Sequence, residues 1–313
     1  MVSDAMFVSS ESQIVLKKFL FPRSETDILS NEKMTGQLLR HLLLTLLLQA
    51  STVHSKIVGA AVIPHGDFSY DPTLLPLNSK SRAAANIVHE AALSLHSFVT
   101  DIKPDVIFLS TPHGMELTNN FVAYLNTNGT GFAAIGQDLH NASKPPRDVP
   151  LVPSPINLAP NLTLALVERL VSLKQNVSGI KTFADSEPAA LRWGEVVPLL
   201  FVPLQVRQKV KTIVWSQPLR RYKESKAMVP ELLEVGRLVA EYLEDLEERV
   251  LVLVSSDLAH THLESGPYGY SNASEPFDQA IGRWLENPKK DAESLLVTAR
   301  NLEDRALSCG FTG

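Results

Sequence analysis

Short apolar runs rich in β-branched residues recur from residue 57 onward and alternate with longer stretches of helical periodicity. Bounded by Pro, Gly and Ser, such runs are typical of buried parallel strands, which we expect at 57–63, 105–110, 211–218 and 249–255. Helices are expected at 81–102, 159–173, 229–248, 275–286 and 289–307. The alternation predicts an α/β fold with a mixed, largely parallel central sheet flanked by helices.

A histidine follows three of these predicted strands. The runs are IVGAAVIPHG, ending near His65, DVIFLSTPHG, ending near His113, and RVLVLVSSDLAH, ending at His260. Open α/β sheets bind ligands beyond the carboxyl ends of their strands. The first two strands and the helix between them form a right-handed βαβ unit, which would bring His65 and His113 to one edge of the sheet. We therefore expect a metal cleft at that edge.

Composition narrows the choice of partners and ligands. The 313-residue chain is 44% hydrophobic and carries a formal charge of −5, so it offers no basic field for a nucleic acid. A single cysteine, Cys309, excludes an intramolecular disulfide and a cysteine-based zinc site. On this argument the expected metal ligands are histidines and carboxylates.

His65 and His113 are the candidate metal ligands. Each lies in a Pro-His-Gly turn, in which proline stiffens the approach and glycine lets the backbone pass close to a ligand. A histidine satisfied by backbone hydrogen bonds is the alternative for either residue alone, and the repeated turn favours ligands. Neutral imidazoles suit Fe, Zn, Cu or Ni, and two histidines with one carboxylate are typical of non-haem Fe(II) oxygenases.

The segment SSDLAHTH at 255–262 adds Asp257, His260 and His262. A Ser-His-Asp hydrolase is a weak alternative here, because there is no G-x-S-x-G elbow and the three residue types are crowded into a few positions. We expect His260 to act as a general acid/base, while Asp257 hydrogen-bonds nearby backbone or a histidine. The alternative role for Asp257 is only to cap the loop, without any part in the site.

The motifs IPHGDFSYDP, STPHG, LRWGEVVPLLF, SSDLAH and GPYGYSNASEPFD, in this order, resemble the class III extradiol ring-cleavage dioxygenase superfamily. The resemblance is strongest to the branch shared with Memo-like proteins and the AmmeMemoRadiSam system protein B. It covers about 57–313 and leaves an N-terminal extension, 1–56, outside.

The resemblance implies an Fe(II)-dependent dioxygenase that cleaves the ring of a catechol-like or aminophenol-like aromatic with O₂. His65 and His113 fall on the metal ligands of the family, and His260 falls on the histidine that handles protons at the substrate. A cytoplasmic location is implied as well, and a homo-oligomer is left open. Zn is the alternative metal.

The chain departs from the family pattern near its C-terminus. The family's glutamate ligand precedes a Cys-Gly pair, but Ser308 occupies that position here. If the helix 289–307 continues, Asp304 lies one turn before Ser308 on the same face, so Asp304 is the expected third ligand and Glu303 the next choice. Relatives also continue beyond the position of Gly313, so a shortened C-terminus is expected.

These departures leave two alternatives to ring cleavage. One is a non-catalytic Memo-like protein that uses the same residues to bind a metal or a peptide. The other is a zinc-type hydrolase built on the histidine pair and Asp257. The change from the common Asp-His-Gly turn to Arg192-Trp193-Gly194 removes a histidine that would contact substrate and leaves the substrate class open.

The N-terminal extension contains a leucine-dense stretch, LLRHLLLTLLLQAS at 38–51, which follows Met34. Arg40 and His41 and the short length argue against a membrane span, so a signal-like apolar region from Met34 competes with an ordinary apolar helix. The chain contains five Asn-x-Ser/Thr sequons, and this number slightly favours a secreted protein. Secretion or membrane association through 34–51 is therefore the alternative to a cytoplasmic location.

Overall fold

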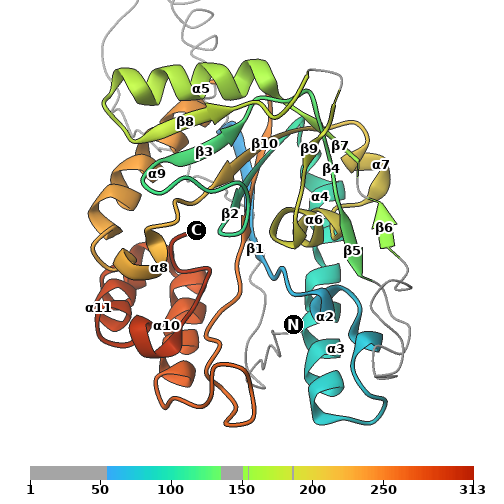
Figure 1. The fold of residues 1–313 in the computed structure, drawn as a ribbon, viewed down its shortest axis with the longest axis vertical. Helices are drawn as coiled ribbons and strands as arrows, with labels where there is room; N and C mark the ends of the chain where they lie inside the picture. Colours follow the sequence, from blue (N-terminus) through green and yellow to red (C-terminus); the bar gives the residue numbers. More distant parts are fainter. Residues whose placement is uncertain (1–54, 135–150, 154, 185–186) are drawn as a thin grey trace, which may run out of the picture.

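The structure, a computed structural model, describes residues 55–134, 151–153, 155–184 and 187–313 (Figure 1). The N-terminal extension expected at 1–56, including the leucine-dense stretch, lies outside the described residues except for its last two positions. No helix among the described residues is both long and apolar enough to cross a lipid bilayer.

Four parallel strands form one side of the central sheet, starting from its edge strand β1. In spatial order they are β1 (Ile57–Ile63), β11 (Val250–Ser255), β2 (Val106–Thr111) and β10 (Lys211–Ser216). The sheet continues beyond β10 through β7 (Ile156–Leu158), β4 (Asn128–Thr130) and β9 (Ala189–Ala190), and β10 also pairs antiparallel with β3 (Phe121–Tyr124), which carries β8 (Val177–Ile180). A separate pair consists of β5 (Phe132–Ala134) and β6 (Leu151–Pro153).

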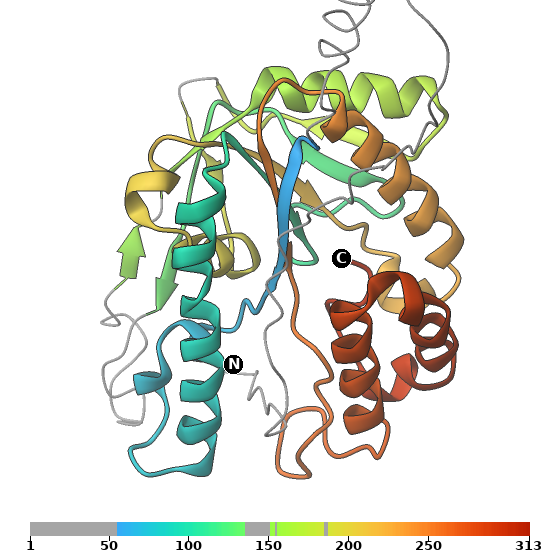
Figure 2. The ribbon, with the colours of Figure 1, turned by 180° about the vertical axis from the view of Figure 1, so that it is seen from behind.

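Helices cover both faces of this sheet (Figures 1 and 2). One core cluster joins the sheet to α4 (Leu95–Ile102), which continues from α3 (Lys80–Leu93), and to α6 (Trp193–Leu200). The cluster on the other face joins it to α5 (Pro160–Ser172) and α9 (Val229–Glu244). A third cluster lies between α10 (Ser274–Glu286) and α11 (Pro288–Ala306), and the short helices are α2 (Asp67–Tyr70), a 3-10 turn at Pro72–Leu74, α7 (Leu204–Arg207) and α8 (Arg221–Glu224).

The predicted fold class is confirmed, because the sheet is mixed and largely parallel and helices flank it. One expected helix, 81–102, is two helices, since Ser94 separates α3 from α4. An apolar run, VVPLLFVPLQ at 196–205, begins inside helix α6, and the first turn of this helix contains the buried carboxylate of Glu195.

Candidate metal centre

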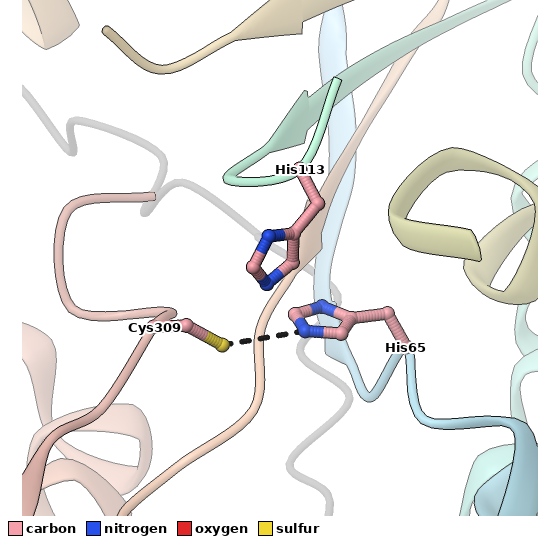
Figure 3. A group of neighbouring side chains, drawn as sticks. All are labelled: His65, His113 and Cys309. Carbon is pink, nitrogen blue, oxygen red and sulfur yellow. Dashed lines mark hydrogen bonds between the residues drawn. The ribbon is translucent and has the colours of Figure 1, made fainter. Parts of the chain in front are cut away.

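His65 and His113 lie beside each other, although 48 positions separate them in the sequence. Each follows its strand by two residues, β1 ending at Ile63 and β2 at Thr111. These strands run parallel on either side of β11, so their carboxyl ends reach the same edge of the sheet. The two imidazole rings meet edge to face, with 4.8 Å between their centroids (Figure 3).

The turn that carries His113 is held by the start of helix α6. The backbone N–H of His113 donates to Oγ1 of Thr111 over 3.2 Å, and that hydroxyl donates to the carbonyl of Gly194 over 3.0 Å. A Cβ atom on Gly194 would lie 2.7 Å from Cβ of His113, so only glycine permits this approach. The Trp193 ring lies 5.3 Å from the His113 ring. The Arg192-Trp193-Gly194 sequence that departs from the family pattern therefore packs directly against His113.

Two hydrogen bonds from the end of β11 and the residues after it orient His65. Its Nδ1 lies 2.9 Å from Oγ of Ser255, and its backbone N–H donates to Oδ1 of Asp257 over 3.0 Å. The Ser255 contact uses Nδ1, so the other ring nitrogen, Nε2, is the one that faces Cys309. Outer hydrogen bonds of this kind fix the orientation of histidines that bind metals.

Cys309 provides the third donor atom near these histidines. Its Sγ lies 3.3 Å from Nε2 of His65, and the donor atoms of His65, His113 and Cys309 all lie within 4.8 Å of one another (Figure 3). The sequence argument named only histidines and carboxylates as ligands, whereas the structure places a cysteine sulfur beside both histidines. One cysteine cannot build a multi-cysteine site, but it can complete a site begun by two histidines.

The backbone after helix α11 determines which side chain reaches the site. The helix ends at Ala306 because Leu307 adopts the left-handed conformation, with a φ of 55°. Ser308 then turns away and donates its hydroxyl to the Asp257 carbonyl over 3.0 Å. A Cβ atom on Gly310 would lie 1.8 Å from Oγ of Ser256, so the chain can pass here only without a side chain.

The same termination keeps Asp304 away from the histidines, contrary to the expectation that it is the third ligand. Its Oδ2 lies 3.0 Å from Nζ of Lys226, and its side chain is 61% exposed. Glu303, the second choice, accepts a hydrogen bond from the Ser225 hydroxyl. The expectation assumed that the helix continues through residue 308, and the left-handed residue at 307 breaks that register.

Asp257 and His260 also lie close to the cysteine sulfur. His260 Nε2 is 3.7 Å from Cys309 Sγ, and its ring stacks on Tyr268 at 5.0 Å. Asp257 is fully buried, and its Oδ2 lies 3.3 Å from Nε2 of His65. Asp257 thus accepts a backbone hydrogen bond from His65, and its second oxygen lies in close contact with the His65 ring. Among the described residues, Asp257, His260 and Cys309 form a second close group of possible ligands.

Burial keeps both histidines of the pair neutral. It lowers the pKa of His65 to about 3, helped by the nearby His260 and Arg221, and lowers the pKa of His113 to about 3, helped by His65 and Arg221. The Arg221 guanidinium is itself buried and donates to the carbonyl of Pro112, next to His113. Neutral imidazole is the form that binds a metal ion.

A buried carboxylate behind the His113 turn escaped the sequence analysis. Glu195 accepts a 2.5 Å hydrogen bond from the Tyr124 hydroxyl on one oxygen and a 2.7 Å bond from the Arg192 N–H on the other. The Tyr124 hydroxyl accepts in turn from the N–H of Met115 over 2.5 Å. Burial raises the pKa of Glu195 to about 7. A single acid ahead of the apolar run VVPLLF was the available signal for this network.

Comparison with known proteins adds one distant relative. No protein-family model matches the chain. A Clostridium acetobutylicum protein without a functional name is 25% identical over 262 residues, which cover 80% of this chain and 49% of that protein. The chain thus spans about half the length of this curated relative, and the match carries no assignment of function.

Proposed function

We propose that the protein binds one metal ion between His65, His113 and Cys309, and that it is a metal-binding member of the extradiol dioxygenase and Memo-like superfamily. The convergence of three donor atoms from distant parts of the chain carries this proposal. The Ser255 contact that orients His65 and the low pKa values of both imidazoles support it, because the donors need little rearrangement to bind.

The donor set favours a thiophilic metal. Two neutral imidazoles and one sulfur suit Zn²⁺ or copper, whereas the iron of an extradiol enzyme is held by two histidines and a carboxylate. In this chain Ser308 takes the position of that carboxylate, and the sulfur of the next residue, Cys309, lies 3.3 Å from Nε2 of His65. Of the functions that the sequence left open, the Memo-like metal-binding protein is therefore the one that this geometry supports best.

Ring cleavage is the second candidate, because His260 lies beside the donor group. Bound Fe(II) would supply coordination positions for the hydroxyl oxygens of a catechol-like or aminophenol-like substrate and for O₂. His260 would then take the proton from a substrate hydroxyl, and its stacking on Tyr268 would hold the ring in place.

The geometry does not favour a serine hydrolase. Ser255, His65 and Asp257 do meet through hydrogen bonds and a close contact. Ser255 is fully buried, however, so its hydroxyl has no access to a substrate. The same contacts serve to orient His65 for a metal.

Anaerobic metal titration tests the proposal. The full chain, stripped with a chelator, is titrated with Zn²⁺, Cu⁺ and Fe²⁺, and bound metal is measured by mass spectrometry. We expect one ion per chain, with Zn²⁺ or Cu⁺ held more tightly than Fe²⁺. Equal metal content in the wild type and a His65→Ala/His113→Ala variant would overturn the site. Uptake of O₂ by the iron-loaded chain with catechols or 2-aminophenols would establish ring cleavage instead.

A further inference from the structure

A groove with mainly apolar walls runs beside helix α9. One cavity, of about 280 Å³, lies between α9 and the strands β2, β10 and β11, and a second, of about 240 Å³, lies between α9, β11 and the α10–α11 pair. The two cavities share five lining residues, so we treat them as one α9 groove: Leu232, Leu233, Val254, Phe311 and Gly313. Pockets for small molecules have volumes of roughly 300–1,000 Å³. The two cavities together fall within this range.

The walls of the α9 groove are held by packing on two sides. On the sheet side, the Trp215 ring stacks on the Phe121 ring with 5.2 Å between their centroids. On the C-terminal side, the Phe311 ring meets the Phe277 ring of α10 edge to face at 6.1 Å. Figure 2 shows the C-terminus between the sheet and the α10–α11 pair. A molecule that enters a groove with fixed walls loses little free energy to ordering of the protein.

Apolar surface inside the α9 groove is left partly in contact with solvent. Leu233 lines both cavities, yet its side chain is 58% exposed. Val252 and Val254 of β11 are only half-buried, although parallel sheets in α/β proteins are usually covered on both faces. A Cβ on Gly236 of α9 would meet no described atom within 4 Å. An apolar molecule in the groove would remove this surface from water, which stabilises the complex.

Two buried polar atoms line the α9 groove and have no hydrogen-bond partner among the described residues. One is Oε1 of Gln217, a residue 2% exposed, and the other is Oγ1 of Thr312, a residue 6% exposed. The Gln217 amide is held in place, because its Nε2 donates to Oγ of Ser110 over 3.1 Å. Its Oε1 is therefore left to accept. Since buried polar atoms are nearly always paired, both atoms point to a polar group on a ligand.

The lining chemistry favours an uncharged ligand with a hydroxyl at one end. The described lining residues have no charged side chain, so a carboxylate or an ammonium group would be buried there without a partner. A hydroxyl can donate to Gln217 Oε1 and accept from the Thr312 hydroxyl. The second cavity is lined almost entirely by apolar side chains, among them Ile281, Leu295 and Leu296. That part of the groove suits an aliphatic chain.

We propose that the α9 groove binds one small aliphatic alcohol. The hydroxyl of the alcohol pairs with Gln217 and Thr312, and its chain passes Leu233 toward α10 and α11. The site uses none of the three donor residues of the metal centre, so this inference does not depend on the proposed metal binding.

Calorimetric titration of the full, chelator-stripped chain tests the proposal, with octanol as the probe. We expect saturable binding of one octanol per chain. Octyl methyl ether has no donor for Gln217, and octanoate carries a charge, so each is expected to bind at least tenfold more weakly. A lack of saturable octanol binding, or equal affinity for octanol and the ether, would overturn the proposal.

A substitution that fills the α9 groove gives a second test. Because a Cβ on Gly236 meets no described atom, Gly236→Leu is expected to fold normally, as thermal denaturation will show, and to weaken octanol binding at least tenfold. The matched control is Gly282→Leu on α10, where a Cβ also meets no described atom and neither cavity is lined, and it should bind octanol as the wild type does.

The polar end of the α9 groove is tested separately. Gln217→Met removes the acceptor and should abolish the preference for octanol over octyl methyl ether. Undiminished octanol binding by Gly236→Leu would contradict the proposal. A wild-type dimer in sedimentation that Gly236→Leu dissociates would also contradict it, because the groove would then be occupied by a second copy of the chain.

Discussion

The sulfur of Cys309 lies 3.3 Å from Nε2 of His65, which joins the last residues of the described chain to the end of its first strand, 244 positions earlier. The three donor atoms of His65, His113 and Cys309 therefore come together only when the C-terminal turn is docked against β1 and β11. Loss of this arrangement can therefore result from unfolding of the C-terminal turn as well as from a change in one of the three side chains.

Substitution of Cys309 should change which metal the protein prefers. Cys309→Ser removes the sulfur, and we expect affinity for Zn²⁺ or Cu⁺ to fall at least tenfold, because a neutral hydroxyl is a poor ligand. Cys309→Asp restores a carboxylate beside the two histidines and should raise the preference for Fe²⁺ over Cu⁺. Competition titrations with chromophoric chelators measure both effects. Asp304→Asn is the control, since its exposed carboxylate pairs with Lys226, and it should leave affinity unchanged.

Substitutions should distinguish a histidine that binds the metal, His65, from one that only lies beside it, His260. His65→Ala is expected to abolish stoichiometric metal binding, whereas His260→Ala should keep one metal per chain. If the protein cleaves rings, His260→Ala should also lower the rate by roughly 10²–10⁴. His96→Ala, at an exposed position on α4, is the matched control. Equal metal loss in the His65 and His260 variants would show that both are ligands.

The metal-free protein should lose stability as the solution is acidified. Histidine in the unfolded chain takes up a proton near pH 6.5, but burial lowers the pKa of His65 and of His113 in the folded protein to about 3. Between these values the unfolded state binds more protons, so the free energy of unfolding falls as the pH falls. The slope is at most about 1.4 kcal/mol per pH unit for each histidine.

Urea denaturation at pH 7 and pH 5 measures this slope, which His65→Gln should reduce. Glu195 acts in the opposite direction, because burial raises its pKa from 4.5 to about 7 and its contribution to stability falls as the pH rises through that range. In the Glu195→Gln variant, the free energy of unfolding should therefore depend more steeply on pH than in the wild type. A flat profile in the wild-type apoprotein would contradict the assigned histidine pKa values.

Gly194 should be intolerant of a side chain. In Gly194→Ala the new Cβ would lie 2.7 Å from Cβ of His113 and 2.8 Å from Oγ1 of Thr111, so we expect a loss of about 1–3 kcal/mol in the free energy of unfolding and weaker metal binding. Gly282→Ala on α10 meets no described atom within 4 Å and should be neutral or stabilising by up to about 1 kcal/mol. Thermal denaturation and metal titration of the two variants distinguish crowding from a general effect of alanine.

The sequence was sufficient for the sheet and for the histidine pair. Apolar runs identified β1, β2, β10 and β11 within a few residues, and the rule that parallel strands end at a common edge placed His65 beside His113. Both inferences depend on local periodicity, which a single sequence displays directly.

The third donor could not be found in that way. Whether Asp304 or Cys309 reaches the histidines depends on the residue at which α11 ends, and the left-handed conformation of Leu307 has no local signature such as glycine or asparagine. Packing of the C-terminal turn against the sheet determines which of the two side chains reaches the histidines. The Glu195–Tyr124 pair was missed for a related reason, because its partners lie 71 positions apart.

The absence of a side chain at Gly310 has a further consequence. Its backbone rests against Ser256, and any larger residue would push the whole turn outward. Cys309 and Gly310 thus act together: Cys309 supplies the sulfur, and Gly310 lets the turn pack closely enough for that sulfur to reach His65. In a related chain that keeps the cysteine but replaces the glycine, we expect the sulfur to lie farther from the histidines than it does here.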